Sequence, residues 1–471
     1  MMYLENIQIK IKQSLRQFLA NLPFSHHLYK LGKYGPNFFI FRALCKKRET
    51  FSRSEIEQYQ LRKLRALLKH VSRQVPFYRD FFKKHHLSLN DFRTLKDIER
   101  LPVIQKSFMR ENVVQFIAEN KVVFKPVSVK TSGSTGTPFQ FYLDKDLICF
   151  YDVLYWRWHY WAGYYLNDPY ALMCMPIGYR KGIIDRESLY FYDPLSKMLE
   201  LNTLFFDETH MREMAELINK YKVLVLLGYP YLLFHFARFV EKEMLNLPIR
   251  VILSQSEMLY PEQREKIENI FKVKVSNSYT MEERTLFACE CPEGRMHVSF
   301  ESGILEVIKN GKLCKPGEIG EFVLTGLHNR SMPFIRYAIG DFGCYKEETC
   351  PCGSSFPVIE VHGDRGKSLF DTSKGYINIF SEYAFLDKNL SKRIKQIQIY
   401  QDKIDEIILK VVKDDSFSDA DEKSLVALYS EILGGEIKIL IEFVEKIERS
   451  PSGKFKYVDS EIGSRSNNAL S

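Results

Sequence analysis

The chain has 471 residues, of which 45% are hydrophobic, 27% charged and 14% aromatic. This composition supports large apolar cores and excludes a mainly disordered chain, and the length fits about two to four domains. Nine cysteines are few for this length, which argues against a disulfide scaffold and favours a reducing, cytoplasmic compartment.

No stretch is long and apolar enough to predict a membrane-spanning helix, which needs about 18 uninterrupted apolar residues. The strongest candidate, residues 223–240, contains Gly228, Pro230, His235 and Arg238 and instead predicts a buried strand followed by a helix. Basic residues interrupt the first apolar positions, so no signal peptide is expected.

The net charge of +8 is concentrated at the N-terminus, because residues 1–50 hold nine Lys/Arg and two acids, a local charge of +7. This basic segment is also rich in aromatic residues. Two interpretations remain open: it contacts an anionic membrane face peripherally, or it packs on the body of the protein and solvates its charges. The nearly neutral remainder of the chain argues against a nucleic-acid partner.

Helical spacing dominates residues 51–118. Apolar residues from Ile56 to Val71 recur with the period of an amphipathic helix that ends at Val75-Pro76, and Leu101-Pro102 opens a further loop and helix.

From about 120 to 360, short apolar runs alternate with helical stretches, which predicts an α/β sheet. The expected strands are 122–129, 170–176, 223–227, 251–253 and 273–276, and the expected helices are 208–221, 231–245 and 261–271. Residues 300–345 are richer in strands. After about 365 comes a smaller α+β unit with strands at 394–400, 406–412 and 437–443 and a helix over 419–433.

The clearest local motif is Thr131-Ser132-Gly133-Ser134-Thr135-Gly136-Thr137-Pro138. Backbone N–H groups of such a glycine-rich loop can hold phosphate oxygens, although by composition alone a surface turn is an equal alternative. It is not a Walker A loop, since no Gly-Lys-Ser/Thr follows.

Four further motifs carry candidate ligand residues. Ser278-Tyr279-Thr280-Met281-Glu282-Glu283 offers an aromatic ring and an acid, and Asp341 stands after Gly340. Gly363-Asp364-Arg365-Gly366-Lys367-Ser368 and Ser452-Gly453-Lys454 place cations on glycine-containing loops. Each is weak alone, because such residues are more often solvated turns.

Taken together, in this order and spacing, these motifs resemble the adenylate-forming superfamily of acyl-CoA synthetases and adenylation domains. Within it the chain is similar to the phenylacetate–CoA ligase and CapK-like capsule-biosynthesis branch. The features that point to this branch are Gln58 with Leu61 and Leu64 before Val75-Pro76-Phe77-Tyr78, Leu101-Pro102 followed by Lys106, and Gly228-Tyr229-Pro230.

The resemblance implies an α/β fold with a large N-terminal adenylation domain of several subdomains and a small, mobile α+β C-terminal domain. The expected divisions are a basic segment (1–50), an AMP-binding domain (51–364), a hinge (365–369), a C-terminal domain (370–460) and a tail (461–471).

The resemblance also implies a role for each matching residue. Ser132, Gly133, Ser134, Thr135 and Gly136 correspond to the phosphate-binding loop, Tyr279 to the aromatic beside adenine and Glu283 to the Mg²⁺ ligand. Asp341 and Arg365 would contact ribose, Lys367 would be the hinge pivot, and Lys454 would be the catalytic lysine. Positions 256, 280 and 282 depart from the pattern: Ser256 and Thr280 replace glycines and Glu282 replaces a threonine, which leaves the substrate open.

A Cys/His set gives a separate candidate site. Cys291, His297, Cys350 and Cys352 supply the Cys₃His ligands of a tetrahedral structural zinc site, with Cys289 as a competing ligand. By the residues alone, reduced cysteines in loops are an equal alternative. Similar positions in CapK-like relatives favour structural Zn²⁺.

The sequence therefore predicts an ATP- and Mg²⁺-dependent ligase that forms an acyl-adenylate from a small carboxylic acid. The acceptor is coenzyme A, or an amine or hydroxyl in surface-polysaccharide biosynthesis. The alternatives are a degenerate, non-catalytic nucleotide-binding module at a membrane and a zinc-ribbon nucleic-acid binder, which the neutral body disfavours. Five aromatics could line an acyl pocket, but core packing is the expected role of each: Phe150, Tyr151, Trp156, Trp158 and Tyr179.

Overall fold

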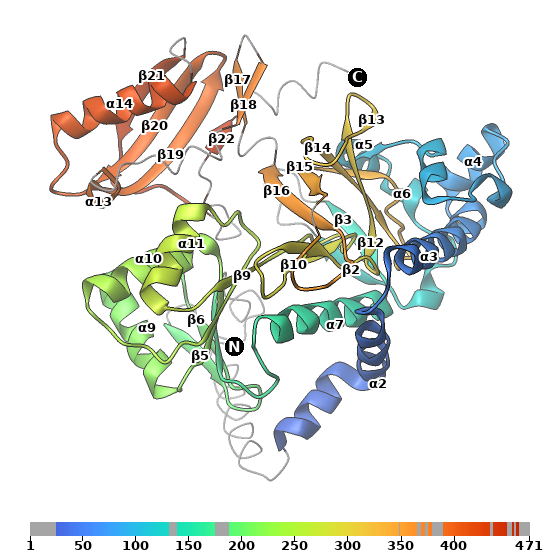
Figure 1. Cartoon of the computed structure of the whole chain (residues 1–471), viewed down its shortest axis with the longest axis horizontal. Helices are drawn as coiled ribbons and strands as arrows, with labels where there is room; N and C mark the ends of the chain where they lie inside the picture. Colours follow the sequence, from blue (N-terminus) through green and yellow to red (C-terminus); the bar gives the residue numbers. More distant parts are fainter. Residues whose placement is uncertain are drawn as a thin grey trace, which may run out of the picture.

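A computed structural model gives the fold of the chain (Figure 1). It describes residues 25–130, 139–174, 188–347, 349–364, 369–372, 375–378, 390–433, 437–449, 455 and 458–460. Its centre is one 14-stranded sheet in which the strands run β13-β12-β14-β15-β16-β11-β10-β9-β8-β7-β4-β6-β5, with β1 paired to β15.

Five neighbouring strands of this sheet are parallel. They are β6 (Met198–Leu201), β4 (Tyr170–Met173), β7 (Val225–Gly228), β8 (Val251–Gln255) and β9 (Val275–Thr280). The connecting helices are α9 (Glu208–Lys220), α10 (Pro230–Lys242) and α11 (Pro261–Phe271). Strand–helix alternation therefore produced the α/β sheet that the sequence predicts, here with parallel strands.

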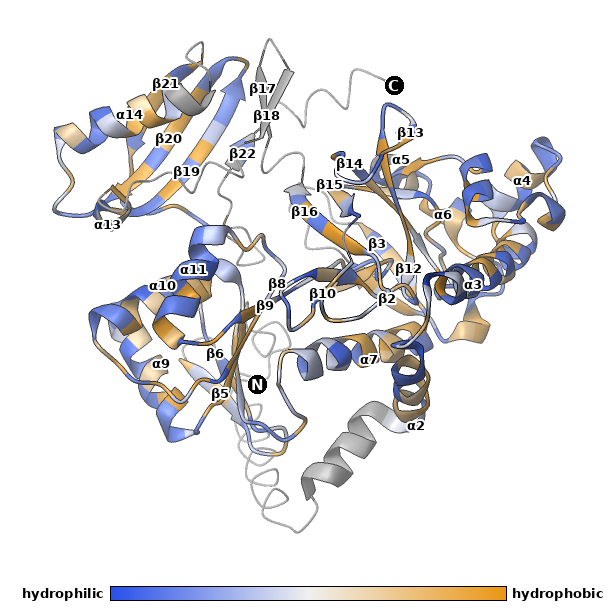
Figure 2. Cartoon of the chain, in the orientation of Figure 1, coloured by the Kyte–Doolittle hydropathy of each residue, from blue (hydrophilic) through white to orange (hydrophobic). Residues whose placement is uncertain are grey.

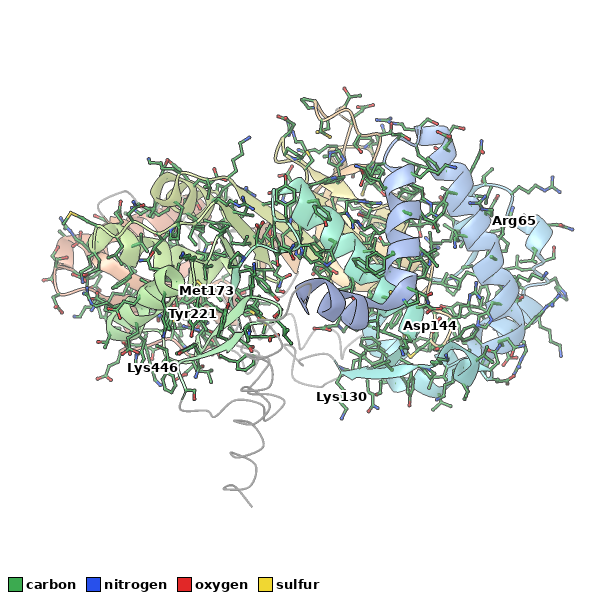
Figure 3. The ribbon with its side chains drawn as sticks, turned by 90° about the horizontal axis from the view of Figure 1, so that it is seen from below. Arg65, Lys130, Asp144, Met173, Tyr221 and Lys446 are labelled. Atoms are coloured by element: carbon green, nitrogen blue, oxygen red, sulfur yellow. The ribbon has the colours of Figure 1, made fainter. Side chains whose placement is uncertain are left out.

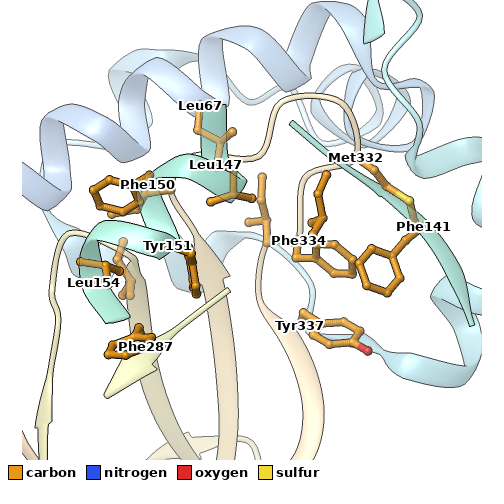
Figure 4. Packing of buried hydrophobic residues seen from close by; sticks show 14 of the residues in the cluster. Leu67, Phe141, Leu147, Phe150, Tyr151, Leu154, Phe287, Met332, Phe334 and Tyr337 are labelled. Atoms are coloured by element: carbon orange, nitrogen blue, oxygen red, sulfur yellow. The ribbon is translucent and has the colours of Figure 1, made fainter. Parts of the chain in front are cut away.

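Helices cover both faces of the parallel strands. Because side chains alternate along a strand, Val225 and Leu227 join the core beneath α7 (Lys145–Trp161), whereas Leu226 joins the core formed with α9 and α10. Figure 4 shows the α7 side of this packing, where Tyr151 and Leu154 lie near Phe287 of β10 and Leu147 lies near Leu67. The α/β fold class is confirmed.

Antiparallel strands extend the sheet beyond β9. These strands are β10 (Phe287–Glu290), β11 (Met296–Val298), β12 (Gly303–Lys309), β13 (Lys312–Leu313), β14 (Gly320–Gly326), β15 (Tyr337–Lys346) and β16 (Val358–Asp364). β5 (Tyr190–Asp193) closes the other edge and pairs antiparallel with β6. Figure 3 shows the two halves from below: Met173 and Tyr221 lie in one part of the molecule, and Asp144 and Arg65 lie in the other.

The N-terminal helices pack on the antiparallel half. Helix α3 (Arg53–Gln74) begins at a capping box formed by Ser52 and Glu55 and buries its apolar stripe from Ile56 to Val71. The extended backbone of Val75 ends it, and Pro76 then starts α4 (Pro76–Lys84). Short elements follow: η1 (Leu89–Asp91), η2 (Leu95–Arg100), β1 (Ile104–Gln105), α5 (Lys106–Glu111), α6 (Val113–Phe116), η3 (Lys121–Phe124), β2 (Val127–Lys130) and β3 (Gln140–Leu143).

A separate four-stranded sheet forms near the C-terminus, in the order β21-β20-β19-β22. It contains β19 (Ile394–Lys403), β20 (Glu406–Lys413), β21 (Lys438–Phe443) and β22 (Val458–Ser460), with α13 (Leu390–Arg393) and α14 (Asp419–Leu433). Alternate residues of β19 and β20 face α14 to form a core of their own, and Figure 2 shows the resulting apolar and polar bands. The hairpin of β17 (Leu369–Thr372) and β18 (Gly375–Asn378) precedes this sheet.

Residues 122–129 are not one strand, so that prediction is wrong. The 3-10 helix η3 occupies Lys121–Phe124, and β2 starts only at Val127. The backbone of Lys125 is left-handed, with φ 51°, and the following Pro126 cannot donate to a ladder. These two residues turn the chain between the elements.

Four of the five aromatics considered for an acyl pocket are core residues, as expected. Phe150, Tyr151, Trp156 and Trp158 of α7 are buried in the largest core cluster, whereas Tyr179 lies outside the described residues.

The N-terminal basic segment contributes one described helix, α2 (Ser25–Arg48), which the non-helical backbone of Gly35 interrupts. Phe38 and Cys45 of α2 are buried against α7, so this part packs on the body. Among the described residues, no helix is apolar enough over a sufficient length to traverse a bilayer. The domain limits at residues 50, 364, 369 and 460 remain predictions.

Candidate active site

The candidate site lies where the parallel strands end. Gly228 of β7 pairs with Ser254 of β8, and Ser254 pairs with Asn277 of β9, so the carboxyl ends of these strands form one edge. Ligands of open α/β sheets bind at this edge. Gly228 fits here because a Cβ would stand 2.7 Å from the carbonyl oxygen of Met173.

Two of the predicted nucleotide ligands meet at this edge. The hydroxyl of Tyr279, at the end of β9, donates a 2.6 Å hydrogen bond to Oδ2 of Asp341 on β15. Gly340, immediately before Asp341, has φ 92°, a backbone conformation that favours glycine. The aromatic ring and the carboxylate are thus held beside each other although 62 residues separate them.

Asp341 also stands directly opposite Asp364 in the β15–β16 ladder. The predicted hinge motif therefore begins across the strand from the predicted ribose ligand. Arg365 and Lys367 themselves lie outside the described residues, as do the phosphate-loop residues Ser132 to Gly136 and the predicted catalytic Lys454.

Glu283, the predicted magnesium ligand, is only 2% exposed. Its Oε1 accepts a 3.1 Å hydrogen bond from Nζ of Lys106 and a 3.0 Å hydrogen bond from the hydroxyl of Tyr337. Burial, followed by the charge of Glu283, raises the pKa of Tyr337 well above its usual value. Tyr337 therefore stays protonated and remains a donor.

β-Pairing brings these three residues together. Ile104 and Gln105 of β1 pair parallel with Tyr337 and Ala338 of β15, and helix α5 starts at the next residue, Lys106. The sequence marked Lys106 only as part of a branch motif. Its pairing with Glu283 was missed, because no local pattern relates two residues that are 177 positions apart.

The four predicted zinc ligands converge. Each of Cys291, His297, Cys350 and Cys352 offers one ligand atom, and these atoms all lie within 4.8 Å of one another. Sγ of Cys291 and Sγ of Cys350 are 3.6 Å apart, and Sγ of Cys352 is 3.4 Å from Nε2 of His297. Ligand atoms about 2.0–2.3 Å from a tetrahedral zinc stand at similar separations.

The surroundings of His297 fix the nitrogen that faces the cysteines. Nδ1 lies 3.0 Å from the carbonyl oxygen of Phe356 and donates to it, which leaves Nε2 as the acceptor beside Cys352. Burial lowers the pKa of His297, so the ring is neutral at pH 7. Cys289, the competing ligand, is packed in the largest core cluster instead and is not a member of this group.

A second group of possible metal ligands contains Cys344, Glu360 and His362 on β15 and β16. Its carboxylate is already paired, because Nζ of Lys346 lies 2.5 Å from Oε2 of Glu360. This hydrogen bond is the largest contribution that lowers the pKa of Glu360. The proximity of three possible ligand atoms is the only feature of the described residues that points to a metal here, and we assign none to this group.

Comparison with known proteins agrees with the geometry of the chain. Residues 369–461 match the CapK C-terminal domain family. Protein CapK of Staphylococcus aureus is 25% identical over 428 residues, which cover 87% of this chain and 90% of CapK. The phenylacetate-coenzyme A ligase of Thermus thermophilus is 24% identical over 360 residues, covering 69% of this chain and 75% of the ligase.

A solved structure of 2-hydroxyisobutyryl-CoA ligase, in its postadenylation state with R3-HIB-AMP, has the same fold. The TM-score is 0.69 at 19% identity, and the match covers 90% of this chain and 94% of the ligase chain. Residues 369–461 thus match the CapK C-terminal domain family, the chain is similar in sequence to CapK and to the phenylacetate-coenzyme A ligases over most of its length, and it shares its fold with 2-hydroxyisobutyryl-CoA ligase.

Proposed function

We propose that this protein is an ATP-dependent ligase that activates a small carboxylic acid as an acyl-adenylate and passes the acyl group to an acceptor. The observation that carries the proposal is the hydrogen bond between Tyr279 and Asp341 at the carboxyl edge of the sheet. This contact supports the proposal because it joins an aromatic ring to a carboxylate, and these two groups can bind the base and the ribose of a nucleoside. By name, two kinds of relative are coenzyme A ligases, of phenylacetate and of 2-hydroxyisobutyrate.

In this proposal the nucleotide spans the edge of the sheet. Adenine lies beside Tyr279. Asp341 accepts hydrogen bonds from the ribose hydroxyls, and Arg365 donates hydrogen bonds to the ribose. The backbone of residues 132–136 binds the departing pyrophosphate, and Lys367 serves as the pivot of the C-terminal domain. Apart from the pivot Lys367, all of these groups bind and orient the nucleotide.

The chemical step joins two anions, because the substrate carboxylate attacks the α-phosphate of ATP. The products are a mixed anhydride and pyrophosphate. Charge neutralisation is therefore the main requirement, and the ammonium of Lys454 would provide it at the α-phosphate. Losing one such group costs on the order of 10²–10³ in rate in other enzymes.

Glu283 offers the hard oxygen ligand that Mg²⁺ prefers, and bound Mg²⁺ would neutralise phosphate charge. The carboxylate is held in place through Oε1 by Lys106 and Tyr337. A cation that enters here competes with the Lys106 ammonium for Glu283.

The test is pyrophosphate release with MgATP over a panel of carboxylic acids, repeated with Lys454→Ala. At least one acid should give turnover that the variant loses by on the order of 10²-fold or more. ATP binding without pyrophosphate release for any acid would instead favour the non-catalytic nucleotide-binding alternative. Failure to bind ATP at all would contradict both.

The acceptor follows from the second half-reaction. Coenzyme A is the acceptor in the names of the ligase relatives, whereas the CapK relationship supports an amine or hydroxyl acceptor in surface-polysaccharide biosynthesis. Mass spectrometry of the product formed from the acyl-adenylate with coenzyme A, and separately with amino sugars and hydroxyl acceptors, distinguishes a thioester from an amide or ester.

We also propose that Cys291, His297, Cys350 and Cys352 hold a structural zinc ion. Three thiolates and one imidazole form a closed tetrahedral ligand set, and the hydrogen bond from His297 to Phe356 orients the ring. Elemental analysis should find a stoichiometric amount of zinc, which Cys350→Ser loses and Cys344→Ser retains. Equal zinc in all three proteins would exclude this ligand set.

A cytoplasmic location, with peripheral contact at the inner membrane face through residues 1–50, is also part of the proposal. The last turn of α2 carries Lys46, Lys47 and Arg48, and Phe39 and Ile40 are exposed. Basic and apolar groups on one helix support binding to anionic lipid. Sedimentation with anionic vesicles, but not with neutral ones, is the expected result; equal recovery would contradict membrane contact.

A further inference from the structure

The C-terminal sheet (β19 to β22) contacts the large α/β unit, which contains the 14-stranded sheet, through two stacked aromatic rings. Tyr231, in the first turn of α10, and Phe455 have ring centroids 4.4 Å apart and planes inclined by only 10°. Both side chains are almost fully buried, at 3% and 6% exposed. With Leu232, Val412 and Ile447 they form a small apolar cluster that bridges the two units.

Polar contacts surround this stack. The hydroxyl of Tyr231 accepts a 2.6 Å hydrogen bond from Nε2 of Gln396 on β19. The guanidinium of Arg449 lies 5.2 Å from the centre of the Tyr231 ring and 5.5 Å from the centre of the Phe206 ring. It also donates a 3.0 Å hydrogen bond to the carbonyl oxygen of Thr203.

Phe455 is fixed through its backbone as well. Its N–H donates a 3.1 Å hydrogen bond to Oε1 of Glu257, which follows β8. Arg449 and Phe455 thus both contact the large unit, and they stand on either side of Lys454 in the sequence.

The contacted residues lie at the functional edge of the sheet. Thr203 follows β6, Tyr231 follows β7 and Glu257 follows β8, and these strands are parallel to β9, which ends at Thr280. The C-terminal unit is therefore docked on the same edge that carries Tyr279 and Glu283. Figure 1 shows this unit beside α10 and α11.

We propose that Tyr231, Arg449 and Phe455 form a latch of positioning residues that holds the C-terminal sheet against this edge during adenylation. The latch rests on the proposed function, in which Lys454 acts at the α-phosphate. Its contacts are one ring stack, two cation–π contacts of Arg449 and a few hydrogen bonds, a set small enough to separate when the C-terminal sheet turns for acyl transfer.

The two half-reactions test the latch separately. Acid-dependent exchange of labelled pyrophosphate into ATP reports adenylation, and consumption of chemically prepared acyl-adenylate with the acceptor reports transfer. Tyr231→Ala should slow exchange by on the order of 10- to 100-fold, as expected when a reacting group loses its position, and should leave transfer at least as fast as in the wild type.

Conservative and control variants separate positioning from general damage. Tyr231→Phe keeps the ring stack and removes only the hydroxyl, which accepts the Gln396 hydrogen bond, so its exchange rate should recover to within about threefold of wild type. Phe443→Ala removes an exposed ring of the same C-terminal sheet that contacts Phe417 and should change neither half-reaction. The latch would be overturned if Tyr231→Ala slowed both half-reactions equally, or if it slowed neither.

A measurement that does not depend on activity tests the latch independently of the proposed function. Small-angle X-ray scattering of the full chain should show a more extended particle for Tyr231→Ala and Phe455→Ala than for the wild type and Phe443→Ala. If the wild type activates no acid, the ligase proposal fails while scattering still decides whether the contact holds the units together. Identical scattering curves for all four proteins would refute the latch itself.

Discussion

Nζ of Lys106 lies 3.1 Å from Oε1 of Glu283, which joins the start of helix α5 to the turn after β9. The Lys106 side chain is 36% exposed, whereas that of Glu283 is 3% exposed. The buried carboxylate is therefore paired with a lysine that is partly exposed to solvent. The hydroxyl of Tyr337 is a second hydrogen-bond donor to the same oxygen.

Lys106→Met should destabilise the protein because it leaves the buried carboxylate of Glu283 without its cation. The expected loss in the free energy of unfolding is about 1.5–3 kcal/mol, as for hydrogen bonds to charged groups. Urea unfolding measures it, with the exposed Lys96→Met as the matched control. Adding Glu283→Gln should restore most of the loss, and a double variant as unstable as the sum of both single variants would contradict the pairing.

Asp341→Ala should weaken ATP binding by about tenfold or more, since the ribose would lose a charged hydrogen-bond acceptor. Tyr279→Phe removes only the hydroxyl that holds Asp341 and should weaken binding less, by about two- to fivefold. Calorimetric titration with a non-hydrolysable ATP analogue gives both values. Tyr345→Phe, whose hydroxyl donates to Leu305 on the same sheet, is the control; affinities that are the same in all variants would remove Asp341 from the site.

A strong chelator should lower the melting temperature of the wild type if zinc binds the folded Cys₃His set, because the ion stabilises only the state that binds it. For a loss of a few kcal/mol we expect a decrease of about 5–10 °C. Cys291→Ser should already melt lower and should respond little to the chelator. A wild-type melting curve that the chelator does not move would argue that the group holds no metal.

Stability should fall as the pH falls below about 6.5. Burial lowers the pKa of His159 and of His328 to about 3, and both ring nitrogens of His159 lack a partner among the described residues. Between pH 6.5 and 3 the unfolded chain binds protons that the folded chain does not. Each histidine therefore lowers the free energy of unfolding by about 1.4 kcal/mol for each unit by which the pH falls.

The change in unfolding free energy between pH 6 and pH 5 measures this effect. His328→Asn should reduce the slope by the equivalent of about one bound proton. A slope that does not change in His328→Asn would show that this ring is protonated in the folded protein.

Ser256→Gly should stabilise the protein by about 1 kcal/mol. Ser256 has φ 71°, a left-handed backbone that costs residues with a Cβ roughly 1–2 kcal/mol, and glycine adopts it without this penalty. The resemblance to adenylate-forming enzymes implies that glycine is the usual residue at this position. Ser256→Ala keeps the Cβ and should show no such gain in denaturant unfolding; a gain of equal size in both variants would contradict the backbone explanation.

The elements of this fold could largely be predicted because their signals are local. The helix predicted over 419–433 is α14, and the helix predicted over 261–271 is α11. The exception was 122–129, where apolar β-branched residues predicted one strand. The backbone turn at Lys125 and Pro126 divided it, and β-propensity does not detect such a turn.

By itself the sequence determined the strands and helices, the candidate ligand residues and the resemblance to adenylate-forming enzymes, because each depends on residue types at fixed short spacings. Only the tertiary structure decided which distant side chains meet. Nζ of Lys106 donates a hydrogen bond to Glu283, and the hydroxyl of Tyr279 donates one to Asp341. These contacts depend on the order and register of strands in the sheet, which are set by the packing of the whole chain and by no local pattern.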